Sequence, residues 1–379
     1  MDYYAITIDT CIFENHGLSL EKGLLAQLEQ FSASQFKFIL SDVVYNELRK
    51  HLIDKNKTSR TSVNHAIKAA SNCHLINDDA LESVKKIFAD CKEDDKNADD
   101  RLENFVRKTS LEIISSADFV DITRLIEMYF SSSLPFEPSG AKKSEFPDAL
   151  ALLAIESWAE NNNVKVLAVS TDKGWAGFAE NSNFITVVEG LADALAHFQT
   201  HSFADRIVNR LQLLFTEDNT HHLIVEIEDA IVSSVEEADD ITIEATSRFY
   251  YEEEETYATH IEHTFALDEA GNVKINVVRD SDDTLVLQLK AEVTCEVNCY
   301  FSLSVFDSID KDYVSMGGVN ANTEENYSTS ILLYITGDFR NGLDGIELSK
   351  VEVLKTVRKA YFGDIEPDWG NEDPERGED

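Results

Sequence analysis

Four acidic residues stand at places where their carboxylates can act together. Asp9 and Asp172 each follow a short apolar run that is typical of a strand, and Asp148 and Glu47 lie early in two predicted helices. In open α/β sheets, ligands collect outside the carboxyl ends of the strands. Helical side chains lean toward the helix N-terminus, which carries the two helical acids toward that edge. The pattern predicts four carboxylates at one edge of a sheet.

Four clustered carboxylates repel one another, which raises the pKa of some of them unless cations are bound. Hard divalent cations such as Mg²⁺ or Mn²⁺ are held by a few carboxylates together with waters and substrate phosphates. Such an ion lowers the pKa of a bound water, orients it toward phosphorus and stabilises the developing negative charge. The predicted chemistry is therefore phosphodiester hydrolysis with Mg²⁺ or Mn²⁺ as cofactor, through one ion or two.

The elements that must position these acids alternate between strands and helices. Four apolar runs are short and bounded by turn residues, as expected for strands buried on both faces of a parallel sheet: Tyr3–Ile8, Phe36–Leu40, Val164–Val169 and Phe184–Val188. Ser41 and Asp42 suit the start of the helix that carries Glu47, and Pro147 suits the first turn of the helix that carries Asp148. We expect an α/β domain over residues 1–200, with a central parallel sheet flanked by helices.

Residues 54–144 are expected to form a helical insertion in this domain. Within it, the polar and acidic stretch 90–101 is expected to be a loop, and Ile113–Phe130 is expected to contain an amphipathic helix.

The second half of the chain has a different pattern. Residues 201–237 predict a helical connector, and from Ile241 onward a period of two predicts a mainly antiparallel all-β domain over residues 238–363, followed by an acidic tail, 364–379. The formal net charge is −38. Residues 1–200 hold 31 acidic and 20 basic residues, and the remainder holds 40 and 13. This change in charge density supports a domain boundary near residue 200.

A chain this acidic is not expected to hold nucleic acid by its overall charge, because phosphate binding depends on Lys and Arg. A local basic patch would have to supply the contacts. The candidates for binding substrate phosphates are Lys55, Lys57, Arg60, Lys143 and Lys173.

The five cysteines have scattered spacing and predict free thiols rather than a disulfide framework. No signal-peptide pattern opens the chain, and no apolar run approaches the ~20 residues of a membrane helix. The sequence therefore predicts a cytoplasmic protein with no membrane contact.

The order of four short motifs resembles the PIN-domain ribonuclease family over about residues 3–198. They are IDTCIF at 8–13, SDVVYNEL at 41–48, EFPDALALLA at 145–154 and VSTDKGW at 169–175. The resemblance implies that Asp9, Glu47, Asp148 and Asp172 form the metal site. For Glu145 an accessory role at the metal and a role as a helix-capping acid stay equally open.

By this resemblance the chain is expected to be a metal-dependent endoribonuclease acting on tRNA or single-stranded RNA, in the setting of a toxin or a phage-defence effector. The β domain would then govern self-association, bind a protein partner or gate the site. Two other functions stay open: a catalytically weak PIN-like scaffold or binding protein, and a DNA or flap nuclease.

Overall fold

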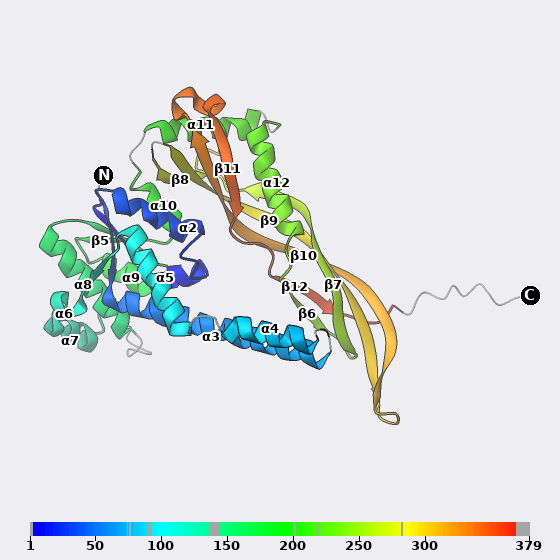
Figure 1. Cartoon of the computed structure of the whole chain (residues 1–379). Coiled ribbons are helices and arrows are strands. Elements are labelled where there is room, and N and C mark those ends of the chain that lie inside the picture. Colours follow the sequence, from blue (N-terminus) through cyan, green and yellow to red (C-terminus); the bar gives the residue numbers. More distant parts are fainter. Residues whose placement is uncertain are drawn as a thin grey trace, which may run out of the picture. The chain divides into compact units, whose positions relative to one another are not determined.

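The computed structural model describes residues 3–73, 75, 77–89, 93–136, 145–199, 202–217, 220–281 and 283–368. Contacts between residues divide the chain into two compact units, Met1–Thr200 and His201–Asp379. Each unit has its own sheet and its own core (Figure 1). In the part of the chain that the structure describes, no helix is long and apolar enough to cross a membrane.

The N-terminal unit is built on a five-stranded parallel sheet in the order β3-β2-β1-β4-β5. Its strands are β1 (Ala5–Ile8), β2 (Lys37–Ser41), β3 (Glu112–Ile114), β4 (Val166–Val169) and β5 (Ile185–Val188). Every residue of β1 and β4 is buried. Burial on both faces explains why these strands read as continuous apolar runs, and it confirms the expected parallel sheet.

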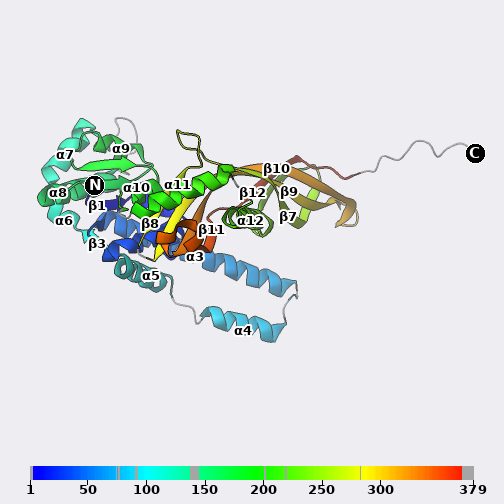
Figure 2. The same cartoon turned by 90° about the horizontal axis from the view of Figure 1, so that it is seen from above.

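Helices surround this sheet. They are α1 (Thr10–Asn15), α2 (Gly23–Ala26), the 3₁₀ helix η1 (Gln27–Ala33), α3 (Asp42–Asn72), α4 (Asp78–Ala89), α5 (Asp94–Thr109), α6 (Ser116–Phe119), α7 (Ile122–Ser131), α8 (Phe146–Asn162), α9 (Lys173–Ala179) and α10 (Leu191–Ala196). Helix α8 packs against β2 and β3, and α10 packs against β4 and β5. The long helix α3 runs beyond the sheet, and α4 returns beside it (Figure 2).

The expectation of a loop over residues 90–101 was wrong for the described residues, because α5 begins at Asp94. Asp94 and Asp95 lie in its first turn, where acidic side chains interact favourably with the helix dipole. Ala98, Leu102 and Phe105 are buried on one face of the helix. Because the segment is mostly polar, its sequence did not indicate a helix, although its apolar residues are three and four positions apart.

The amphipathic helix expected within Ile113–Phe130 is confirmed as α7 (Ile122–Ser131), but the first residues of this stretch belong to the sheet. Glu112–Ile114 forms the edge strand β3, which pairs with β2. The Glu112 carboxylate accepts hydrogen bonds from Lys37 Nζ at 2.6 Å and from Trp158 Nε1 at 3.2 Å, which ties this strand to β2 and α8. A strand of three residues is too short to show a period of two, so its sequence did not reveal it.

The C-terminal unit is built on a large antiparallel sheet in the order β11-β10-β9-β7, with β8 also paired to β9. Its strands are β7 (Tyr250–Phe265), β8 (Ile275–Asp280), β9 (Thr284–Asp307), β10 (Asp312–Gly337) and β11 (Ile346–Val353), and η2 (Phe339–Gly345) joins the last two. The short strands β6 (Thr242–Thr246) and β12 (Lys359–Asp364) pair in parallel as a separate sheet. The mainly antiparallel β architecture is confirmed.

One face of the large sheet carries the core. Odd-numbered residues of β9 from Leu285 to Leu303 are buried, and those at the start of the strand pack against α11 (Ser202–Glu217) and α12 (His222–Glu236). Ile207 and Ile227 of these helices are almost fully buried. Residues 201–237, expected as a connector, therefore supply part of the core of this unit. A smaller cluster around Phe301 joins the sheet to β6 and β12.

Replacing Ile227 by Ala is expected to destabilise the C-terminal unit by about 2–5 kcal/mol, because it opens a cavity in a fully packed core. Val225 lies on the same helix but is 39% exposed, so Val225→Ala is the matched control, with an expected change of about 0.5 kcal/mol or less. Chemical denaturation, monitored by hydrogen exchange, measures the stability of each unit separately. Equal destabilisation of the N-terminal unit by Ile227→Ala would contradict separate cores.

Candidate active site

Asp9 is held at the carboxyl edge of the sheet by both its backbone and its side chain. Its N–H donates to the Val169 carbonyl at 3.0 Å, which continues the β1–β4 pairing one residue beyond the strand. Ser170 Oγ donates to Asp9 Oδ2 at 2.6 Å, and the Cys11 thiol donates to the same oxygen at 3.0 Å. Burial and the neighbouring Asp9 carboxylate raise the pKa of the Cys11 thiol, so Cys11 is a donor here and not a thiolate.

Asp172 stands beside Asp9 because Ser170 contacts both residues. The Asp172 N–H donates to Ser170 Oγ at 2.9 Å. Asp172 Oδ1 accepts from the N–H groups of Gly174 at 2.6 Å and Trp175 at 3.3 Å, which caps α9. A Cβ at Gly174 would lie 2.8 Å from this same oxygen and 3.1 Å from the Pro135 Cβ, so a larger residue here would have to displace the capping carboxylate.

Asp148 lies in the first turn of α8, and the indole of Trp175 links it to α9. Trp175 is fully buried, and its Nε1 donates to Asp148 Oδ1 at 3.0 Å. Burial is the largest cause that raises the pKa of Asp148 to about 6, and the Trp175 hydrogen bond acts against it. The negative charges of Asp9, Asp172 and Glu47 raise this pKa further, which places all four carboxylates within electrostatic reach.

Glu47 reaches the same edge from α3. The Ser41 side chain caps this helix by accepting from the Val44 N–H at 3.2 Å, so the helix begins directly at the end of β2. Glu47 is half-buried in the second turn, and its Oε2 accepts a hydrogen bond from Thr10 Oγ1 at 2.8 Å. Thr10 is the residue after Asp9, so this bond brings the fourth acid to the end of β1.

These contacts share one feature: each carboxylate has one oxygen fixed by protein donors. The fixed oxygens are Asp9 Oδ2, Glu47 Oε2, Asp148 Oδ1 and Asp172 Oδ1. Among the residues that the structure describes, the second oxygen of each has no hydrogen-bond donor. Donors that fix one oxygen of a ligating carboxylate while the other binds the ion are a common feature of metal sites.

The carboxylates lie near one another but not at ligand distance. Within the described ranges, no three His, Cys, Asp or Glu side chains converge closely enough to hold a metal ion. Carboxylate oxygens are the ligands that Mg²⁺ and Mn²⁺ take, so the chemistry of these four side chains fits such an ion. Asp9, Glu47, Asp148 and Asp172 are the residues that would hold it.

Glu145 occupies the position before α8, but its side chain does not cap the helix. Its backbone carbonyl accepts from the Ala149 N–H at 3.0 Å, which is the first turn of the helix. Glu145 is thus the N-cap residue without a capping hydrogen bond from its side chain, and both its role as a capping acid and its role at the metal stay predictions.

The basic candidates are not gathered at the acidic edge. Lys173 is exposed at the start of α9, directly after Asp172, whereas Lys143 lies outside the described residues. Lys57 is 4.0 Å from Asp54, and Arg60 is 2.9 Å from Asp94. Arg60 follows Glu47 along α3 by 13 residues, a separation of about 20 Å.

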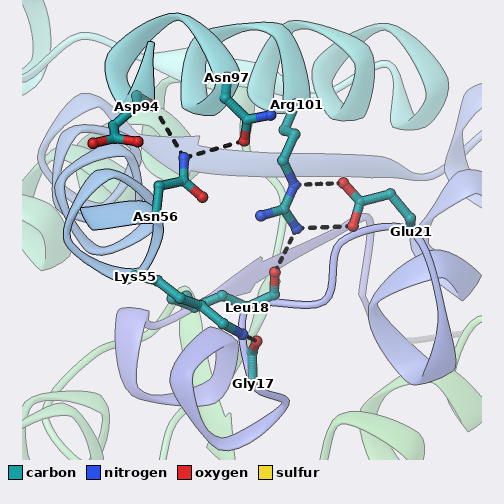
Figure 3. Close-up of polar contacts among 8 residues, drawn as sticks. All are labelled: Gly17, Leu18, Glu21, Lys55, Asn56, Asp94, Asn97 and Arg101. Atoms are coloured by element: carbon teal, nitrogen blue, oxygen red, sulfur yellow. Dashed lines mark hydrogen bonds and ion pairs between the residues drawn. The ribbon is translucent and has the colours of Figure 1, made fainter. Parts of the chain in front are cut away.

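Lys55 makes a structural contact close to the loop after α1. Figure 3 shows its ammonium group donating to the Gly17 carbonyl, beside Arg101, which donates to Glu21 at 2.7 Å. Burial and the positive charge of Arg101 lower the pKa of Lys55. Lys55 and Arg60 therefore hold α3 against its neighbours, while Lys173 follows Asp172 directly in the chain.

Sequence reasoning missed the residues that hold the acids in place. Thr10, Cys11 and Ser170 are short polar side chains adjacent to an acid or two residues from one. Trp175 is fully buried, and its indole N–H binds Asp148. Their only sequence signal is a place inside the motifs that contain Asp9 and Asp172.

Asp148→Asn is expected to stabilise the metal-free protein above pH 6. An acid whose pKa is higher in the folded state than in the unfolded state destabilises the fold when it ionises. This penalty is absent below about pH 4, grows as the pH rises and is complete above about pH 6, where it reaches roughly 3 kcal/mol at most. Asn keeps the acceptor for Trp175.

Thermal unfolding in EDTA at pH 4 and pH 8 measures this difference. Glu160→Gln, on an exposed position of the same helix, removes the same charge and is the control. An equal gain in both variants, or a gain at pH 4, would contradict a raised pKa for Asp148 in the folded protein.

Ser170→Ala is expected to weaken Mn²⁺ binding by about 10–100-fold, because Asp9 loses the hydroxyl that orients it. Isothermal titration calorimetry measures the affinity, and Ser182→Ala, a loop serine that accepts from backbone N–H groups before β5, is the control. Unchanged affinity in Ser170→Ala would show that this hydrogen bond does not position a ligand.

A comparison with protein-family models finds the PIN domain, matched over residues 6–175. The match begins in β1 and ends at Trp175, so it contains all four acids and Ser170. No curated protein and no solved structure matches the chain. PIN domains are generally nucleases that use divalent metals. Residues 6–175 of this chain match the PIN-domain family model, and that family is one of nucleases.

Proposed function

We propose that this protein is a metal-dependent endoribonuclease that hydrolyses RNA phosphodiester bonds at the Asp9–Asp172 edge of the N-terminal sheet. The observation that carries the proposal is the arrangement of the four carboxylates within a PIN domain, each with one oxygen fixed by a protein donor. Four acids without cations are a costly arrangement, which a binding scaffold would not need.

In this proposal the four acids form the metal site together. Asp9 and Asp172 are joined through Ser170 and form a fixed pair at the ends of β1 and β4, while Asp148 and Glu47 approach from α8 and α3. Bound Mg²⁺ or Mn²⁺ supplies an activated water and neutralises the charge that develops on the phosphate. Lys173, exposed next to Asp172, is placed to contact a substrate phosphate.

Asp148 adds a dependence on pH. Its carboxyl group must lose its proton to bind a cation, and its pKa lies near 6 in the metal-free protein. Cation binding and cleavage are therefore expected to weaken as the pH falls below about 6.

RNA is proposed as the substrate because the motifs resemble those of PIN-domain ribonucleases. A tRNA or a single-stranded RNA fits this class, and a toxin or phage-defence role is proposed on the same resemblance. Because the chain as a whole is strongly acidic, substrate binding is expected to depend on the bound cations and on a few local lysines rather than on the overall charge.

The test is cleavage of labelled tRNA, single-stranded RNA and DNA by the full chain, with Mg²⁺, Mn²⁺ or EDTA. Asp9→Asn and Asp172→Asn are each expected to reduce cleavage at least about 100-fold, since each removes a charged ligand. Asn still accepts from Ser170 at position 9 and still caps α9 at position 172, so both variants should fold.

Glu160→Gln is the control and should cleave like the wild type. If both Asn variants cleave RNA as fast as the wild type, the proposed active site is wrong. Cleavage of DNA alone would make the protein a DNA nuclease, and binding of RNA without any cleavage would favour a scaffold.

A further inference from the structure

The long helix α3 carries a row of exposed lysines that begins one turn from an acid of the site. Lys50, Lys57 and Lys68 are separated by 7 and 11 residues. These separations are close to two and three whole turns of about 3.6 residues, so the three side chains lie on one face of the helix. Lys50 follows Glu47 by three residues, and residues three apart are neighbours on a helix surface. The lysine row therefore starts beside Glu47 and extends along α3 for about 27 Å.

The charge of this part of the chain differs from that of the whole. Residues 55–72 contain four Lys or Arg residues and no Asp or Glu, although the net charge of the chain is −38. Among the described residues, Lys50 and Lys68 have no ion-pair partner. Lys57 lies 4.0 Å from Asp54, and an exposed pair of this kind is weak. The lysine row is thus available to an anionic ligand.

The far end of the lysine row lies at a pocket between α3 and α4, the two helices that run side by side in Figure 2. The pocket has a volume of about 450 Å³. Cationic, amide and apolar side chains of both helices line it, among them Arg60, Asn64, Lys68, Leu81, Lys85 and Phe88. None of the described residues that line the pocket is acidic.

Two of the cations at this pocket already have partners. Arg60 pairs with Asp94 at 2.9 Å, and Lys85 pairs with Glu82 at 3.2 Å. Lys68 belongs both to the pocket and to the lysine row, so it connects the two. Phe88 is only half-buried, which leaves part of its ring open to a ligand.

A row of cations that leads to an aromatic ring fits a single-stranded nucleic acid. Lysines contact successive phosphates, and unstacked bases stack on aromatic side chains. The bases of a double helix are stacked on one another and do not reach such a ring. A polyanion without bases would use the lysines but gain nothing from Phe88.

We propose that α3 and α4 bind the single-stranded part of the RNA substrate beside the scissile bond, with phosphates on the lysine row and one base against Phe88. This inference rests on the proposed ribonuclease function. At about 3.4 Å per nucleotide, the spacing along one strand of a duplex, the row corresponds to roughly eight nucleotides. It gives a strongly acidic chain a local surface on which RNA is held.

The first test measures binding of a labelled single-stranded RNA of about 16 nucleotides, twice the length of the row. Fluorescence anisotropy is recorded at several salt concentrations in the Asp9→Asn background with Mg²⁺, so that the RNA stays intact. The triple variant Lys50→Gln/Lys57→Gln/Lys68→Gln should bind about 10–100-fold more weakly, and its slope of log K against log salt should be smaller by about 2.

The control is Lys22→Gln/Lys108→Gln/Lys165→Gln, which removes the same charge from three exposed lysines outside α3 and α4. It should bind RNA like the Asp9→Asn protein. Equal weakening in both triple variants, or none in the variant of the lysine row, would overturn the proposal.

A second test asks whether the ligand has bases. Phe88→Leu keeps an apolar side chain but removes the ring, so RNA should bind about 5–100-fold more weakly while inorganic polyphosphate binds as before. Ile87→Leu, at an exposed position outside the pocket lining, is the control. Polyphosphate bound as tightly as RNA, or no effect of Phe88→Leu on RNA, would make this a general anion surface and exclude the proposal.

Cleavage kinetics with Asp9 intact separate this proposal from the proposed function. The triple variant of the lysine row should cleave RNA of about 16 nucleotides with a raised KM and an unchanged kcat. RNA of about four nucleotides is too short to reach past Lys57 and should be cleaved equally by the variant and the wild type. If the wild type cleaves no RNA while the binding results hold, the ribonuclease function fails and the RNA-binding surface stands. A lowered kcat with unchanged KM would contradict a role in holding the substrate.

Discussion

The mutual repulsion of four carboxylates at one sheet edge is the constraint on which the N-terminal unit depends. Burial, the largest cause, and this repulsion together raise the pKa of Asp148 to about 6, and donors from several elements hold the carboxylates in place. Ser170 holds Asp9, Thr10 holds Glu47, and Trp175 holds Asp148. A divalent cation would relieve the same repulsion, which supports the metal site that we propose here.

The parallel sheet brings these groups together. β1 and β4 are neighbours and end side by side, which places Asp9 near Ser170 and hence near Asp172. Two helices start near this edge and each contributes an acid in its first or second turn. The geometry therefore follows from strand order and helix starts, and little of it depends on long loops.

The sequence predicted the acids because their positions follow from the ends of strong apolar runs. It did not predict Ser170 or Thr10 as their donors, since a short hydroxyl side chain next to a turn has many ordinary roles. The strand at Glu112–Ile114 was missed because three residues carry no period, and helix α5 was missed because its acids outnumber its buried apolar residues. The basic residues of α3 were predicted from type alone, and sequence could not show that Arg60 already pairs with Asp94.

The most direct measurement of the central claim is anomalous diffraction from crystals of the full chain soaked in Mn²⁺. The account predicts a Mn²⁺ peak at the carboxyl ends of β1 and β4, about 2.0–2.2 Å from the second oxygens of Asp9 and at least one of Glu47, Asp148 and Asp172. A well-soaked crystal with no peak at that edge, or with Mn²⁺ only elsewhere, would contradict it.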